Sequence, residues 1–167
     1  MKKLLLVLLF APLVSFGQNY ISDTPPRNYS NIPFGTITKG QERSEILTII
    51  DQFMLAVNTK DKAIFDKILY KGIQKIVTRI DGESRKNTVY DNDSLIQNIA
   101  QRNDEYQERY WDVQVITEGN IASVWAPYDF YKNNSFSHCG VDLFYLVKEE
   151  KKWKIAHFGY TVNTLCK

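Results

Sequence analysis

The sequence predicts a single α+β domain in which three short helices precede a long, curved, mostly antiparallel sheet. Apolar residues recur at three- and four-residue steps over residues 44–58, which is the periodicity of an amphipathic helix. The second half of the chain consists of long runs rich in Val, Ile, Tyr, Phe and Trp, joined by short connections. Helices grouped before strands are typical of the α+β class. The length of 167 residues suits one ordinary domain and is short for two.

The N-terminal residues have the pattern of an export signal. Two lysines precede an apolar run over residues 4–14, and small residues precede Gln18. This order is typical of a secretory signal peptide, with cleavage after Gly17. The run is shorter than the roughly 20 apolar residues that a membrane-spanning helix needs. We therefore expect residues 1–17 to be a signal peptide, the mature protein to be periplasmic or secreted in a bacterium, and no membrane association after cleavage; the alternative is a buried N-terminal helix.

The remaining chain divides into a linker and a domain. Residues 18–42 contain several Pro and Gly residues among polar ones without periodicity, which predicts an extended linker. Residues 43–167 form the predicted domain, beginning with the helix over 44–58. Asp61 caps a second short helix. Ser94 and Gln97 form a capping box for a third.

The strands follow from turn signals and apolar runs. Asp81-Gly82 indicates a hairpin between the first two strands, and Asn133-Asn134 indicates a two-residue turn between two later ones. The expected strands are Ile73–Ile80, Ser84–Tyr90, Tyr106–Ile116, Ile121–Tyr131, Phe136–Lys148 and Lys152–Val162.

Turn lengths set the register, and the register sets which side chains share a face of the sheet. A two-residue turn at 133–134 predicts that Asp129 faces His138 and that Trp125 faces Asp142. If Lys148 opposes Trp153 in the last hairpin, then Phe144 faces His157. The shared face then combines aromatic rings with a few polar groups, which is the composition of a ligand pocket. The predicted pocket residues are Trp125, Asp129, His138, Asp142, Phe144 and His157.

The opposite face is almost uniformly apolar in this register. It includes Val124, Ala126, Tyr128 and Phe130, a set too apolar to face water alone. We expect this outer face to form a homodimer interface.

Charge and cysteine content exclude some functions and favour one cross-link. The formal net charge is only +2, and no basic run is present, so we expect no nucleic-acid partner. Export favours a structural disulfide between Cys139 and Cys166, the alternative being two separate thiols. The two Cys and two His lack the spacing of a zinc site, and we expect no metal and no cofactor.

The pattern resembles the nuclear transport factor 2-like superfamily, in particular its exported bacterial SnoaL-like and lumazine-binding-like branch. The resemblance rests on the helical start, the bent meander, and the residues at 124–131, 137–142 and 153–155. It implies a cone-shaped barrel closed at one end by helices, a hydrophobic pocket inside, and dimers through the outer sheet face. The superfamily includes isomerases, dehydratases, cyclases and non-catalytic binding proteins, so the fold does not decide the function.

Three interpretations of the function stay open. The first is an exported small-ligand-binding domain with an apolar or aromatic pocket. The second is a cofactor-independent isomerase or lyase that uses Asp142, or a dyad of Asp129 and His138, as its general base. The third is a structural protein with a filled core. Each candidate residue also has a structural alternative. His138 could hold the rim of the sheet through its hydrogen bonds, and Asp142 could pair with a cation such as Arg109. His157 could be a core residue, or it could join His138 and Asp142 at a metal.

Overall fold

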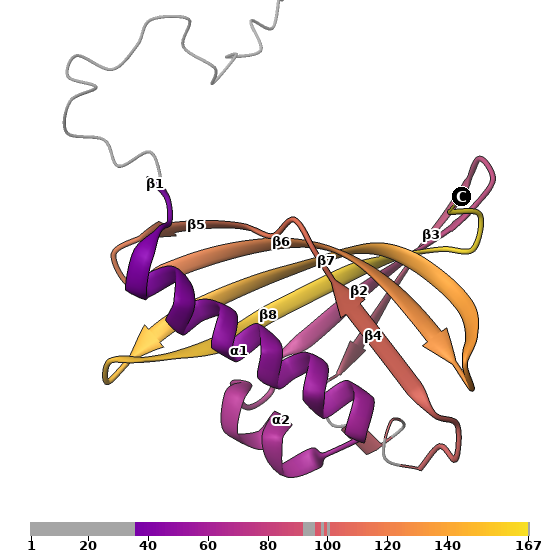
Figure 1. Cartoon of the computed structure of the whole chain (residues 1–167), viewed down its shortest axis with the longest axis horizontal. Helices are drawn as coiled ribbons and strands as arrows, with labels where there is room; N and C mark the ends of the chain where they lie inside the picture. The colour runs from indigo at the N-terminus through magenta and orange to yellow at the C-terminus, as the bar shows by residue number, and fades with distance from the viewer. Residues whose placement is uncertain (1–35, 92–95, 98, 100, 167) are drawn as a thin grey trace, which may run out of the picture. The chain divides into compact units, whose positions relative to one another are not determined.

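The computed structural model describes residues 36–91, 96–97, 99 and 101–166, which lie within one compact unit over Pro33–Lys167 (Figure 1). The expected signal peptide, most of the expected linker and the helix cap Ser94 lie outside the described residues. Strand β1 (Thr36–Ile37) and the start of helix α1 (Gly40–Thr59) fall inside the range expected to be linker. The folded domain therefore begins earlier than the sequence pattern indicated, because β1 pairs with β5 (Gln114–Glu118).

Two helices lie where their periodicity predicted them. Helix α1 contains the expected amphipathic stretch and buries Ile46, Ile50 and Phe53. Helix α2 (Lys62–Ile68) is capped by Asp61, whose side chain accepts hydrogen bonds from the first-turn amides. Residues 96, 97 and 99 are helical, within the range of the third expected helix.

The sheet is eight-stranded, and its main path runs β1-β5-β6-β7-β8-β2-β3, with β4 paired to β6. Its neighbours are antiparallel except β2 and β8, which are parallel. Helix α1 lies across the inner face of this curved sheet (Figure 1). The predicted α+β class with a mostly antiparallel sheet is confirmed. The remaining strands are β2 (Gln74–Asp81), β3 (Ser84–Asp91), β4 (Tyr106–Tyr110), β6 (Ile121–Lys132), β7 (Ser135–Glu149) and β8 (Lys152–Asn163).

The run expected as one strand over 106–116 is divided into β4 and β5. Both pair with the same edge of β6, on either side of Pro127. Proline has no N–H to donate, so the ladder is interrupted there. The Trp111 amide still donates to the Pro127 carbonyl at 3.1 Å, and Asp112 adopts a positive φ of 46° at the break.

In the two hairpins that join β6 to β7 and β7 to β8, the strand register away from the turn differs from the prediction by one residue. Lys132 pairs with Ser135 as expected, but the register shifts between Phe130 and Tyr131, so Phe130 rather than Asp129 opposes His138. The last hairpin shifts likewise between Tyr145 and Leu146. Each shift leaves one extra residue on one strand, which is a β-bulge.

The shifts change which residues share a face. Asp142 opposes Ala126 and Tyr160 rather than Trp125 and Gly159, and Phe144 opposes Phe158 rather than His157. The expected outer-face residues Val124, Ala126, Tyr128 and Phe130 point inward instead. The first three of these are at most 1% exposed. The outer face of β5, β6 and β7 exposes Ile116, Ile121, Trp125, Leu143 and Tyr145.

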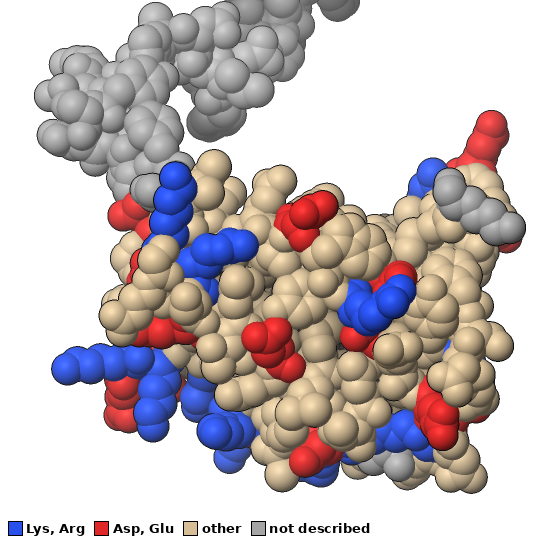
Figure 2. Space-filling model, viewed as in Figure 1, with Lys and Arg blue, Asp and Glu red and all other residues tan. Residues whose placement is uncertain are grey.

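Charged side chains are scattered over the surface seen in Figure 2, and basic ones gather near the end where the turn between β7 and β8 lies. No helix among the described residues is long and apolar enough to cross a membrane.

Candidate functional site

A cavity of about 440 Å³ lies between α1 and the inner face of the sheet. Side chains from α1 and from β2, β3, β4, β6, β7 and β8 line it. Aromatic rings form a large part of its wall, and several ionisable groups from different strands converge on it. The aromatic residues are Phe53, Tyr90, Tyr106, Tyr128, Phe130, Phe158 and Tyr160.

Only two of the residues expected to line a pocket do so. His138 and Asp142 line the cavity. Phe144 is fully buried in the core, where its ring packs against Phe53 at 5.0 Å. The side chains of Trp125, Asp129 and His157 lie on the outer face, because the bulges reverse the expected alternation on β6 and at the end of β8.

The expected dyad of Asp129 and His138 does not form. Asp129 is bound by the guanidinium of Arg109, which is its direct partner across β4 and β6. His157 is likewise separated from His138 and Asp142, since it opposes the exposed Tyr145. No group of three or more metal-ligating side chains occurs in the described part of the chain.

Two carboxyl groups meet at the cavity, Glu108 from β4 and Asp142 from β7. Asp142 is 2% exposed, and its Oδ2 atom meets no N–H or O–H donor of the described residues. Burial raises the pKa of Glu108 and raises that of Asp142 well above its ordinary value, and the neighbouring Glu108 carboxyl raises the pKa of Asp142 further. Two adjacent carboxyls in a desolvated site cannot both ionise readily. The pair therefore holds a proton, with Asp142 as the neutral member.

A buried lysine lies on the same cavity. Lys75 of β2 is 6% exposed, and its ammonium lies 4.9 Å from the ring centre of Tyr90 and 5.6 Å from that of Tyr160. Its Nζ donates to the Tyr160 hydroxyl at 3.5 Å. Burial, with the positive charges of Arg79 and Arg102, lowers the pKa of Lys75 to about 8, although Glu108 opposes this shift.

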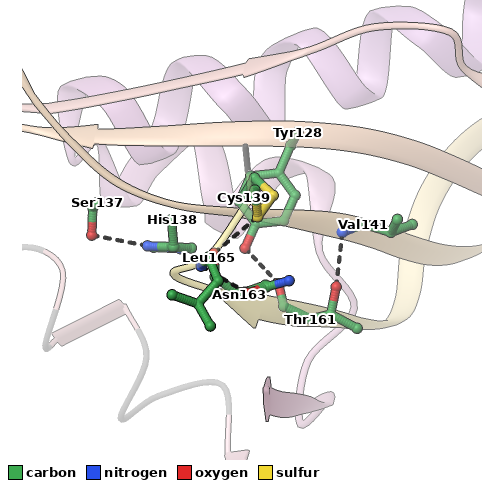
Figure 3. The surroundings of a disulfide bond; sticks show 9 residues. Tyr128, Ser137, His138, Cys139, Val141, Thr161, Asn163 and Leu165 are labelled. Carbon is green, nitrogen blue, oxygen red and sulfur yellow. Dashed lines mark hydrogen bonds between the residues drawn. A yellow bond between two sulfur atoms is a disulfide. The ribbon is translucent and has the colours of Figure 1, made fainter. Parts of the chain in front are cut away.

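His138 is neutral and held by its ring contacts. Its ring stacks on Phe130 with centres 4.9 Å apart, and its Nδ1 lies 3.0 Å from the Ser137 hydroxyl (Figure 3). Burial, with the charge of Arg79, lowers the pKa of His138 to about 4. Tyr128 reaches past it to donate its hydroxyl proton to the carbonyl of Thr161 at 2.8 Å.

The expected disulfide between Cys139 and Cys166 is present beside this site (Figure 3). It joins β7 to the chain beyond β8, with Cα atoms 6.1 Å apart. Gly140 follows directly, and a Cβ there would lie 2.0 Å from the Thr161 carbonyl oxygen. The Thr161 hydroxyl oxygen also accepts a hydrogen bond from the Val141 amide, with an N–O distance of 2.9 Å. Glycine is therefore required where β7 and β8 approach next to the cavity.

Sequence reasoning missed Lys75, Glu108 and Tyr160. A signal for the first two was present, because each is a charged residue at an inward position of an alternating strand. Lys75 lies between the inward Ile73 and Val77, and Glu108 lies between two tyrosines of β4.

Chemically, the cavity offers a neutral carboxylic acid as a proton donor, a carboxyl group able to accept a proton, an amine and aromatic faces. This combination can bind a planar molecule and exchange protons with it.

The comparisons with known proteins agree with this architecture. The sequence model of a family described as putative lumazine-binding matches residues 41–161. Similar solved structures include a nuclear transport factor 2-like protein of unknown function from Shewanella baltica, with 19% identity, a TM-score of 0.53, and coverage of 75% of this chain and 96% of that one. A nuclear transport factor 2-like protein from Cytophaga hutchinsonii has 12% identity, a TM-score of 0.63, and coverage of 74% of this chain and 99% of that one. A third, described as a putative dehydratase from Streptomyces avermitilis, has 12% identity, a TM-score of 0.55, and coverage of 72% and 95%. No curated protein matches the sequence significantly.

Proposed function

The chain belongs to the putative lumazine-binding family, and from that premise we propose that it is an exported domain that binds a small planar aromatic ligand in its inner cavity. The observation that carries the proposal is the cavity of about 440 Å³ with aromatic walls and converging polar groups. Cavities of a few hundred Å³ with this composition suit small organic ligands.

The lining residues favour a fused heteroaromatic ring that carries carbonyl groups. Aromatic side chains such as Phe130 and Tyr160 offer faces and edges against which a planar ring packs. The neutral Asp142 and the ammonium of Lys75 supply hydrogen-bond donors for carbonyl oxygens or ring nitrogens. The family's description names lumazine, a bicyclic ring system with these features, and this makes lumazine the first probe.

The test is a fluorescence titration of the mature protein with lumazine, together with native mass spectrometry of protein taken from its host's exported fraction. We expect saturable binding, or one co-purified small molecule per chain. Phe130→Ala should weaken lumazine binding about two- to tenfold, since an aromatic contact is worth about 0.5–1.5 kcal/mol. Tyr145→Ala is the matched control, because this ring lies on the outer face. An empty protein that does not bind lumazine would overturn the proposal.

Export is the second part of the proposal. The disulfide is compatible with an oxidising compartment. The intact mass of the protein from the periplasmic or secreted fraction should correspond to a chain that begins at Gln18. Recovery of the uncleaved chain from the cytosol would contradict export.

A second candidate function is a cofactor-independent isomerase or lyase. The coupled carboxyls of Glu108 and Asp142 favour it, because a carboxylate with a raised pKa is a stronger base and a neutral one is a ready acid. Asp142→Asn separates the two functions. An enzyme would lose turnover and keep ligand affinity, whereas a binding protein has no turnover to lose.

We also propose a homodimer through the outer sheet face. Trp125 and Leu143 oppose each other there and are 49% and 48% exposed, with the 41% exposed Tyr145 on the next inter-strand pair of that face. Contiguous exposed apolar side chains of this kind mark interaction surfaces. Sedimentation of the mature protein should give a dimer, and Trp125→Glu should give a monomer that still binds lumazine. A monomeric wild-type protein at high concentration would overturn the dimer.

A further inference from the structure

We propose that Lys75 is a nucleophile that captures an aromatic aldehyde in the cavity as an imine. The inference shares an accessible cavity with the proposed function, but it concerns a covalent reaction of this side chain and does not depend on lumazine binding.

The placement of Lys75 differs from that of an ordinary surface lysine. Its strand position points inward, its side chain is 6% exposed, and its Nζ faces the cavity between the rings of Tyr90 and Tyr160. Within the described part of the chain, no carboxylate forms an ion pair with it. An amine that is desolvated and not ion-paired is the arrangement that favours nucleophilic lysines.

Lys148 provides an internal comparison. It also lies on a strand, with its ammonium 5.1 Å from the ring centre of Trp153. Unlike Lys75, it is paired with Glu42 and Glu45, with N–O distances of 3.5 and 3.6 Å, and it does not line the cavity. Stacking over a ring is therefore common to both lysines, whereas access to the cavity and freedom from a carboxylate distinguish Lys75.

The groups around Lys75 can complete the reaction. The lone pair of the unprotonated amine attacks the carbonyl carbon, and a C–N bond forms. The π electron pair of the carbonyl group moves to its oxygen, which takes up a proton from the amine. The product is a neutral carbinolamine. A proton from the pair of Glu108 and Asp142 then converts the carbinolamine hydroxyl into a leaving water, and the nitrogen lone pair forms the C=N bond. The resulting iminium returns its proton to the carboxylate. The sum is amine plus aldehyde giving imine plus water, and no oxidant or cofactor is needed.

The cavity also indicates the class of carbonyl compound. Aromatic rings form a large part of its walls, so a ring attached to the aldehyde carbon would pack against Phe130 or Phe158. The low pKa of Lys75, about 8, leaves about a tenth of the amine unprotonated at pH 7. The charged and titratable groups that face it or share the cavity are Arg79, Tyr90, Arg102, Tyr106, Glu108, Tyr128, Lys132, His138, Asp142 and Tyr160.

The experiment is reductive trapping of the mature protein with benzaldehyde and cyanoborohydride, followed by intact mass measurement and peptide mapping. We expect one benzyl group per chain on the peptide that contains Lys75. At pH 7 this lysine should be labelled at least about tenfold faster than Lys148, because Lys75 faces the cavity without an ion pair, whereas Lys148 is paired with Glu42 and Glu45. The labelling rate should rise with a midpoint near pH 8.

Variants and a second measurement keep the outcome decisive. Lys75→Arg should lose the selective label, whereas Lys148→Arg should keep it. If Lys75→Arg does not fold, the wild-type peptide map decides alone, because equal labelling of Lys75 and Lys148 overturns the proposal. Lumazine titration of the wild type, measured in parallel, separates the two ideas. Selective labelling without lumazine binding would support Lys75 as the nucleophile and overturn the proposed ligand. Lumazine binding without selective labelling would support the ligand and overturn the role of Lys75.

Discussion

The two faces of strands β6 and β7 each carry side chains that are unusual for their surroundings. The inner face, beside α1, buries Asp142 and faces the ionisable groups of Glu108 and Lys75. The outer face exposes nearly half of Trp125 and of Leu143. Both arrangements cost free energy in an isolated domain, because buried ionisable groups lose hydration and exposed apolar groups order water. Such costs are typical of functional surfaces, so the contrast supports the proposals of a ligand at the inner face and a partner at the outer one.

The inner face itself changes character along the strands. Toward the turn between β7 and β8 it is a dry core, in which Phe144 and Leu146 pack under α1. Toward the other end, from Asp142 to His138 on β7, it lines the cavity. The dry half holds the helix on the sheet, and this support lets the other half keep an open volume with polar groups.

The largest effect should come from the dry half of the inner face. Phe144→Ala removes a ring with no exposed surface that contacts Phe53 and Phe158. We expect a loss of about 3–5 kcal/mol in the free energy of unfolding, from lost burial and the cavity left behind. Denaturant unfolding measures it, with Leu143→Ala as the neighbouring control on the outer face. Equal losses in monomeric protein would contradict the contrast between the faces.

The next effect should come from the cross-link at the cavity end. Replacing Cys139 and Cys166 together by Ala should lower the free energy of unfolding by about 2–4 kcal/mol, because the unfolded chain is no longer restricted over the 27-residue separation. Thermal unfolding with and without reductant should show the same loss in the wild type. A reductant effect that persists in the double variant would show that the disulfide is not its source.

The helices and turns of this fold were predictable because their signals are local. Asp61 capping α2 and the turn at Asn133 are each specified by a few adjacent residues. The hairpin between β2 and β3 was also correct, with its turn one residue later, at Gly82-Glu83. Local hydrogen bonding and backbone preference decide these features without reference to the rest of the chain.

The candidate site was harder to predict because its geometry depends on two bulges. Ser137 and Ala156 are the extra residues, and neither is a glycine or proline that would mark an irregularity. One extra residue reverses every later side chain, which placed Asp129 in the expected pocket and left Tyr160 out of it. The uniformly apolar set of residues around Val124 was a sign that the predicted register was wrong, since such a set suits a core better than an interface.

A smaller effect should distinguish the buried carboxyl pair from the outer carboxylate. Because the folded-state pKa of Asp142 is raised, its contribution to stability is complete below the ordinary carboxyl pKa of about 4 and is lost as pH rises through the folded-state pKa. His138, whose pKa is lowered to about 4, acts in the opposite sense over pH 4 to about 6.5, and Lys75 does so from about pH 8 upward. When the free energy of unfolding of the wild type is subtracted from that of Asp142→Asn at each pH, the contributions of His138 and Lys75 cancel.

The difference in unfolding free energy should therefore move in favour of Asp142→Asn between pH 5 and pH 8, by about 1 kcal/mol or more. Urea unfolding at several pH values measures this. A difference that stays constant with pH would mean that Asp142 is already ionised in the folded protein, and the proton assigned to the pair would have to be withdrawn.

The smallest effect should come from Asp129, the residue that the sequence pattern placed in the pocket. Asp129→Asn weakens the pair with Arg109 on the outer side of the sheet, where solvent screens the interaction. We expect its melting temperature, its lumazine affinity and its labelling at Lys75 to match the wild type within the error of each measurement. Asp142→Asn, only one strand away, should change the pH dependence of unfolding. If Asp129→Asn altered ligand binding instead, then β6 would have to lie in the register without the bulge, and the inner and outer faces of the strand would exchange.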